Sequence, residues 1–142
     1  MVLYARDIVE SDFLSLQPTA TVLEGARSMK WSRHGFVVIG APSSPVGIVT
    51  EWDVISKVVA EGKDPANVTL EEIMSGGLVF VEGDMPISAV SQLMTEKGVR
   101  RLLVKQEGKV VGAITAKTMM ARLNEYVDKI SAQIGSLQAP WY

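Results

Sequence analysis

Two stretches of the chain carry one pattern: Val46-Gly47-Ile48-Val49-Thr50 and Val111-Gly112-Ala113-Ile114-Thr115. The glycine and the threonine of the second stretch each follow their counterparts by 65 positions. The same shift aligns further segments without a gap: 7–9 with 72–74, Met29 with Met94, and 37–39 with 102–104. A fixed period across separate segments indicates one structural unit used twice. We therefore predict two pseudo-symmetric halves, whose packing creates a pair of related clefts.

Length and composition limit the classes of protein to which the chain can belong. In a chain of 142 residues, each repeat of roughly 60 residues would be marginally stable alone, so we expect a shared core. The absence of cysteine excludes disulfides, thiolate metal sites and cysteine nucleophiles, and a single histidine argues against a metal site. A net charge of −2 argues against nucleic acid as a partner. The longest run without charged residues, 34–50, is too short and too broken by proline to span a bilayer, so we expect a cytoplasmic protein with no membrane partner.

Each half has the periodicity of a β-α-β-β-α unit. Thr21 and Glu24 form a capping pattern at the start of a helix, and Pro86 suits the first position of the equivalent helix. Short apolar runs predict three strands in each half: 13–16, 36–39 and 46–49, then 78–81, 102–104 and 110–114. A further helix opens at Thr50 in one half and at Thr115 in the other. The predicted fold class is α/β (α+β), with two packed repeats.

The repeat also predicts the domain boundaries. They are 1–62 for the first repeat, 63–69 for a polar linker, 70–124 for the second repeat, and 125–142 for the end of the last helix and a tail. Trp141 and Tyr142 close this tail, where we expect them to dock on a partner or to fray.

The chain resembles a known family of regulatory domains. The tandem β-α-β-β-α unit, with Gly-Ile-Val-Thr-Glu-Trp-Asp at 47–53 and Val-Arg-Arg-Leu-Leu-Val at 99–104, is similar to a pair of cystathionine-β-synthase-type (CBS) domains, also called a Bateman module. The resemblance extends from about Ala5 to Asn124. It implies a regulatory sensor that binds an adenosine nucleotide in a cleft between the repeats. AMP is the first expectation, with ADP, ATP or an S-adenosyl compound as alternatives.

Thr50 and Asp53 are the first candidate site residues. Thr50 lies where a strand gives way to a helix, a position that favours an anion such as a phosphate. Asp53, one turn later, can accept hydrogen bonds from a vicinal diol such as that of a ribose. The resemblance implies these two roles. The same residues also form an acceptable helix cap, and the two roles can coexist.

The resemblance implies the rest of the main pocket as well. In the family, the Thr/Asp element of one half faces strands of the other half. The residues that this places around the adenine are Met74, Val79, Val99 and, beneath the ring, Ile48. Arg100 and Arg101 would reach the phosphates. Because neighbouring strand residues point to opposite faces, we expect only one of these arginines to do so.

The second cleft departs from the pattern. Thr118 replaces the carboxylate, and losing a charge-assisted hydrogen bond costs roughly 1.5–3 kcal/mol. Thr115 and Lys117 can still hold an anion, and His34 aligns with Val99 and could line this cleft. We therefore expect a weaker second site.

Two functions remain open, because Thr50 and Asp53 can cap a helix without binding any ligand. The first is the nucleotide sensor, which would regulate a separate, unidentified effector protein. The alternative is a ligand-independent module for dimerisation or protein interaction. The family resemblance implies a homodimer, a disc of four repeats, under either. From the residue types we expect no enzymatic activity, no catalytic residues and no cofactor besides the regulatory ligand.

Overall fold

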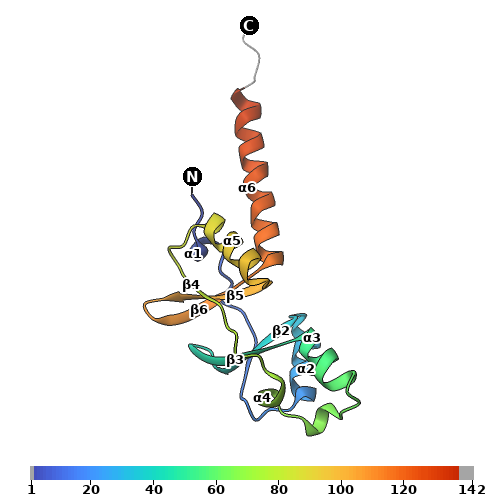
Figure 1. Cartoon of the computed structure of the whole chain (residues 1–142). Coiled ribbons are helices and arrows are strands. Elements are labelled where there is room, and N and C mark those ends of the chain that lie inside the picture. The colour runs from blue at the N-terminus through green and yellow to red at the C-terminus, as the bar shows by residue number, and fades with distance from the viewer. Residues whose placement is uncertain (1, 138–142) are drawn as a thin grey trace.

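The computed structural model describes residues 2–137 and contains two three-stranded sheets, each with helices of its own (Figure 1). The first sheet has the order β1 (Ser15–Leu16), β2 (Phe36–Ala41), β3 (Ser44–Thr50), and the second has the order β4 (Phe80–Glu82), β5 (Arg101–Gln106), β6 (Lys109–Thr115). The helical elements are α1 (Ala5–Ile8), α2 (Val22–Ser32), α3 (Glu51–Val54), the π-helical turn η1 (Ile55–Val59), the 3₁₀ turn η2 (Pro65–Asn67), α4 (Leu70–Ile73), α5 (Ile87–Lys97) and α6 (Ala116–Leu137). The predicted fold class is confirmed.

The two sheets repeat one topology. In each, the first strand pairs in parallel with the second, and the second forms an antiparallel hairpin with the third. Phe36 lies opposite Thr50 in one hairpin, and Arg101 lies opposite Thr115 in the other. These pairs are 65 positions apart, so the sequence period is also the structural period.

The helix starts agree with the capping patterns, with one correction. The Thr21 hydroxyl accepts a hydrogen bond from the Glu24 amide at 3.1 Å, and the Glu24 carboxylate accepts one from the Thr21 amide at 2.9 Å. The placement of Pro86 at the first helical position is wrong by one residue. Pro86 is the N-cap, with extended backbone (ψ 144°), and its carbonyl accepts from Val90.

Two short helices that the sequence patterns did not predict connect the halves. Ala5 and Ile8 of α1 pack in a cluster formed otherwise by the second half, with Val81, Val90 and Ile114 among its members. Leu70 and Ile73 of α4 pack in the equivalent cluster of the first half. The core of each repeat is therefore completed by the short first helix of the other repeat.

A third cluster joins the two sheets. It contains Phe36 and Val38 from β2, Leu103 from β5, and Val110 and Ala113 from β6. Apolar side chains of both halves thus share one core, as expected for repeats too small to be stable alone.

Two repeated glycines let the segments around α1 and α4 pack closely against the sheet of the other half. A Cβ atom added to Gly112 would clash with the backbone carbonyl of Glu10, and one added to Gly47 would lie 2.5 Å from the Met74 sulfur. At these places the incoming segments form bridges with the sheet, Glu10 with Ala113 and Ser75 with Ile48. The close approach needs glycine most at position 112, where the neighbour is backbone rather than a flexible side chain.

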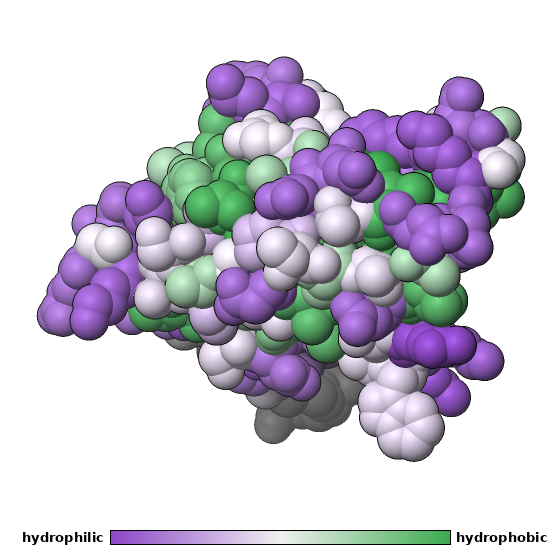
Figure 2. Space-filling model, turned by 90° about the horizontal axis from the view of Figure 1, so that it is seen from below, coloured by the Kyte–Doolittle hydropathy of each residue, from purple (hydrophilic) through white to green (hydrophobic). Residues whose placement is uncertain are grey.

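The last helix extends away from the rest of the molecule. Figure 1 shows α6 leaving the second sheet and projecting beyond both halves. The opposite end of the molecule carries several separate hydrophobic patches among hydrophilic residues (Figure 2). Within residues 2–137, no helix combines the length and the apolar character that crossing a membrane requires. The predicted roles of Trp141 and Tyr142 lie outside the described residues.

Candidate functional site

A cavity of about 460 Å³ opens between the two halves beside the start of α3. We call it the Asp53 cleft; its walls come from β2, β3 and α3 of the first repeat and from 75–79 and 98–103 of the second. Seven residues predicted for the main site line it: Ile48, Thr50, Asp53, Val79, Val99, Arg100 and Arg101. Its other lining residues are Phe36, Trp52, Ser75, Gly77, Leu78, Gly98, Leu102 and Leu103.

The predicted contact of Met74 with the adenine is not supported by its position. Met74 does not line the cleft, and its side chain packs over Gly47 against the core of the first half. The bridge between Ile48 and Ser75 sets this orientation, because neighbouring residues of an extended segment point to opposite sides. Ser75 faces the cleft instead.

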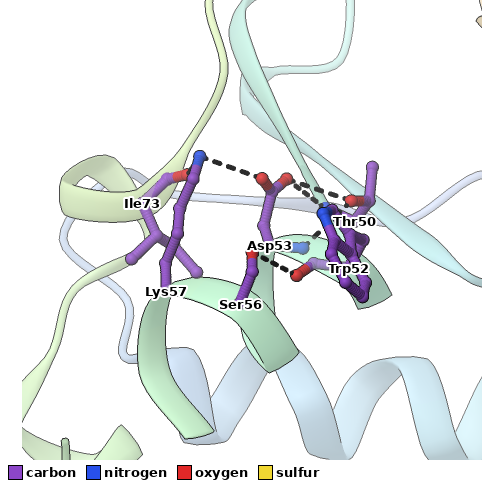
Figure 3. A network of polar contacts seen from close by, with 6 residues as sticks. All are labelled: Thr50, Trp52, Asp53, Ser56, Lys57 and Ile73. Atoms are coloured by element: carbon purple, nitrogen blue, oxygen red, sulfur yellow. Dashed lines mark hydrogen bonds and ion pairs between the residues drawn. The ribbon is translucent and has the colours of Figure 1, made fainter. Parts of the chain in front are cut away.

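Thr50 and Asp53 form a reciprocal cap at the start of α3 (Figure 3). The Asp53 Oδ2 atom accepts hydrogen bonds from the Thr50 amide at 2.8 Å and from the Thr50 hydroxyl at 3.1 Å. The Thr50 hydroxyl in turn accepts from the Asp53 amide at 3.3 Å. Asp53 is only 8% exposed. The cap therefore holds the carboxylate in one orientation at the edge of the cleft.

Lys57 holds the other oxygen of this carboxylate. Its ammonium lies 2.9 Å from Asp53 Oδ1 and donates a hydrogen bond to the Ile73 carbonyl at 2.8 Å (Figure 3). Ile73 is the last residue of α4, where helix carbonyls attract a cation. Lys57 thus connects the candidate site to the segment that crosses between the halves.

The basic side of the cleft is formed by Arg100 and Arg101, which also line the second cleft. The Arg101 guanidinium lies over the Phe36 ring, 5.3 Å from its centroid. Burial lowers the pKa of Arg101, and the nearby charge of Glu51 opposes this effect. An arginine remains protonated at neutral pH even so. Arg100 is exposed, so the two arginines present their charges differently.

A second cavity of about 620 Å³ lies at the pseudo-symmetric position. We call it the Thr118 cleft; all four residues predicted for the weaker site line it, namely His34, Thr115, Lys117 and Thr118. The hydroxyls of Thr115 and Thr118 are 2.9 Å apart, and the Thr118 amide donates to the Thr115 hydroxyl at 3.1 Å. The cap of the first repeat is reproduced here without its charge.

The two clefts differ most in their walls. Ser75 and Gly77 of the Asp53 cleft are replaced in the Thr118 cleft by Glu10 and Asp12. At two further aligned positions, Val99 becomes His34 and Trp52 becomes Lys117. The Nδ1 atom of His34 is buried and has no hydrogen-bond partner within residues 2–137. The Asp53 cleft thus combines one carboxylate with apolar walls, whereas the Thr118 cleft has charged walls and no equivalent carboxylate at the helix start.

Among the contributors to the site that were missed from the sequence are Phe36, Trp52 and Lys57. Phe36 is the aligned partner of Arg101, so the period of 65 residues could have placed it beside the cleft. Lys57 follows Asp53 by one helical turn, a spacing that brings side chains together. Within residues 2–137, no three histidine, cysteine, aspartate or glutamate side chains gather as they would around a metal ion.

Comparison with known proteins identifies the family. The CBS domain model matches residues 5–60 and 70–125. An uncharacterised protein of Methanopyrus kandleri is 36% identical over 118 residues, which cover 80% of this chain and 59% of that protein. A homoserine O-acetyltransferase of Methanohalobium evestigatum is 30% identical over 126 residues, 87% of this chain and 24% of that enzyme.

A solved structure agrees with the family match. The hexameric CBS-CP12 protein from bloom-forming cyanobacteria superimposes with a TM-score of 0.76 at 28% identity, over 84% of this chain and 67% of that one. The chain spans only part of the length of the two relatives described above. The family match covers both repeats of this chain. The chain belongs to the CBS domain family, and its two repeats form a tandem CBS pair, or Bateman module.

Proposed function

We propose that this CBS pair is a regulatory module that binds an adenosine nucleotide in the Asp53 cleft. AMP is the first candidate, and ADP, ATP or an S-adenosyl compound are the alternatives. The observation that supports this proposal is the inequality of two clefts built from one repeat. The cleft that has the helix-start carboxylate is also the one with apolar walls, and these two features suit the two ends of a nucleoside.

The walls offer a place to each part of the ligand. Ile48, Val79 and Val99 form an apolar slot for a purine base. Arg100 and Arg101 line the other side, where we expect one of the two guanidinium groups to bind a pair of phosphate oxygens. A guanine base would bury additional polar groups in the same apolar slot, at a cost in binding free energy.

Asp53 retains capacity to bind a ribose. A carboxylate has about four lone-pair positions. The Thr50 amide and hydroxyl take two of them on Oδ2, and Lys57 takes one on Oδ1. One position stays open for a ribose hydroxyl, and displacement of Lys57 would open another.

The proposal also includes an effector protein, self-association and a location in the cell. Occupancy of the cleft would alter an effector protein, which we do not identify, and the module itself would not be an enzyme. The homoserine O-acetyltransferase relative is consistent with such a role, because the match covers only 24% of its length. The hexameric state of the CBS-CP12 protein supports self-association of this chain, with a disc-shaped homodimer as its unit. Adenosine nucleotides are cytoplasmic metabolites, so we propose a cytoplasmic location.

Calorimetric titration and thermal unfolding with AMP, ADP, ATP, S-adenosylmethionine and GMP would test this function. We expect at least one adenosine compound to bind and GMP to bind less tightly. At a hundredfold excess over its dissociation constant, a ligand should stabilise the fold by about 2.7 kcal/mol. Equal responses to AMP and GMP would contradict the proposed base slot.

A matched pair of variants locates the site. Val99→Phe places a ring in the apolar slot of the Asp53 cleft and should abolish most of the nucleotide response. His34→Phe makes the same side chain at the aligned position of the Thr118 cleft and should leave the response intact. This pair leaves the Thr50–Asp53 cap untouched, whereas Asp53→Ala would also remove hydrogen bonds that stabilise α3. Loss of binding in the histidine variant alone would assign the ligand to the other cleft.

A further inference from the structure

The last helix continues beyond the second CBS domain. The family match ends at residue 125, whereas α6 extends to Leu137. Residues 127–136 are all exposed, and Figure 1 shows this part of the helix projecting clear of both halves. Isolated helices of fewer than about 12–15 residues are marginal in water, since packing supplies most of the stability of helices in proteins. The projecting end of α6 therefore lacks the contacts that usually stabilise a helix.

The exposed apolar residues of α6 lie on one line. They are Met120, Leu123, Val127, Ile130 and Ile134, at alternating intervals of three and four residues. Between positions 120 and 136 the sequence has no other leucine, isoleucine, valine or methionine. Val127 is 57% exposed and Ile134 is 49% exposed. We call this line the α6 seam.

Intervals of three and four residues are those of a coiled-coil heptad. The a positions are Met120, Val127 and Ile134, and the d positions are Leu123 and Ile130. β-Branched residues at a with leucine at d favour two helices that wind around each other. Val127, Ile134 and Leu123 match this pattern, whereas Ile130 at d departs from it. A helix packed against a globular core usually has a wider apolar stripe, with a third position in each heptad. The narrow α6 seam fits a single partner helix.

The residues beside the seam allow a copy of the same helix to be the partner. The e and g positions that flank it carry no charge: Asn124, Tyr126, Ser131 and Gln133. The charged residues beyond Met120 all lie on the outer positions b, c and f, namely Arg122, Glu125, Asp128 and Lys129. Charges at e and g normally set partner choice in coiled coils. With neutral flanks, two identical helices can approach without repulsion between like charges.

We propose that the α6 seam pairs with the α6 seam of a second copy of this chain to form a two-stranded coiled coil. The contact extends past residue 125, so it is additional to any association of the CBS domains themselves. It would hold two modules together irrespective of nucleotide. The proposal does not depend on the proposed ligand, because Ile134 lines neither cleft.

Hydrogen exchange and sedimentation velocity on the full chain test this pairing with three variants. Ile134→Glu places a charge in the seam, Ala132→Glu places the same charge on an outer position two residues away, and Ile134→Leu keeps the seam apolar. In the wild type we expect slow, concentration-dependent amide exchange over residues 126–137 and an assembly with an even number of copies. Ile134→Glu should raise the exchange rates there by about tenfold or more. Ala132→Glu and Ile134→Leu should behave as the wild type.

Three outcomes would overturn the pairing. One is a wild-type chain that stays monomeric at all concentrations. Another is equal exchange over residues 126–137 in the wild type and in Ile134→Glu. The third is slow exchange that does not depend on concentration, which would mean that the seam is covered within one chain. Nucleotide titration of Ile134→Glu separates this result from the proposed function, because its binding should match the wild type.

Discussion

Lys57 occupies part of the carboxylate that the proposed nucleotide would use. Its ammonium lies 2.9 Å from Asp53 Oδ1 and also binds the Ile73 carbonyl. The Lys57 side chain is 44% exposed, which limits the ion pair itself to about 0.2–1 kcal/mol. The hydrogen bond to Ile73 adds about 1 kcal/mol. Lys57 therefore contributes to the stability of the empty module while it competes with a ribose hydroxyl for Oδ1.

The prediction for Lys57→Met follows from this competition. The free energy of unfolding of the empty protein should fall by about 1–2 kcal/mol. The affinity for the adenosine nucleotide should rise by about threefold to tenfold, since a freed acceptor regains a partner only when the ligand is bound. Urea unfolding and calorimetric titration measure the two effects.

Arg122 provides the control, because it occupies the position aligned with Lys57. It pairs with Glu125 at 3.0 Å in an exposed ion pair. Arg122→Met should change the stability by less than about 1 kcal/mol and leave nucleotide affinity unchanged. A fall in nucleotide affinity on Lys57→Met would mean that Lys57 binds the ligand rather than competing with it.

At the scale of elements, the segments around α1 and α4 pack on the opposite halves over Gly112 and Gly47. Their packing depends on these two glycines to different degrees. Gly112 faces the backbone of Glu10, which its bridge to Ala113 fixes in place. Gly47 faces the side chain of Met74, which is flexible and can move aside. Gly112→Ala should therefore lower the free energy of unfolding by about 1–3 kcal/mol, and Gly47→Ala by about 1 kcal/mol or less. The shift of the urea midpoint at constant slope measures the difference. Equal losses would indicate that the Glu10 segment yields as readily as a side chain.

The same segments show where sequence reasoning reached its limit. The hairpins were predictable because strand alternation and the 65-residue period both apply to them. Helices α1 and α4 have four residues each, too few for a helical period to emerge. A capping pattern was present, since the Glu72 carboxylate accepts from the Thr69 amide at 2.8 Å, but it does not tell which half the helix joins. The misplacement of Met74 follows from this, because its direction depends on that crossing.

At the scale of the whole molecule, one duplicated unit has given two unlike clefts. The backbone around them is the same, as the aligned caps at Thr50 and Thr115 show. The difference lies in side chains, with Glu10, Asp12 and His34 in the Thr118 cleft opposed to Ser75, Gly77 and Val99 in the Asp53 cleft. The period made this comparison possible from the sequence. The place of Glu10 and Asp12 in the Thr118 cleft follows only from the packing of the N-terminal segment on the second half.

A graft of the Asp53 cleft onto the Thr118 cleft tests whether the walls or the helix-start carboxylate determine nucleotide binding. Thr118→Asp alone restores the carboxylate but leaves it in a cleft whose walls carry charges of both signs, where the Asp53 cleft has an apolar slot. Because the cleft still lacks an apolar slot for a base, we expect this variant to bind one nucleotide per chain, as the wild type should. Combining it with Glu10→Ser, Asp12→Gly, His34→Val and Lys117→Trp supplies the aligned wall residues of the Asp53 cleft, and calorimetry should then give two nucleotides per chain. A second nucleotide bound by Thr118→Asp alone would show that the carboxylate suffices and that the walls are secondary. A graft that folds with an intact first site but still binds one nucleotide would mean that the aligned residues do not account for the difference between the clefts.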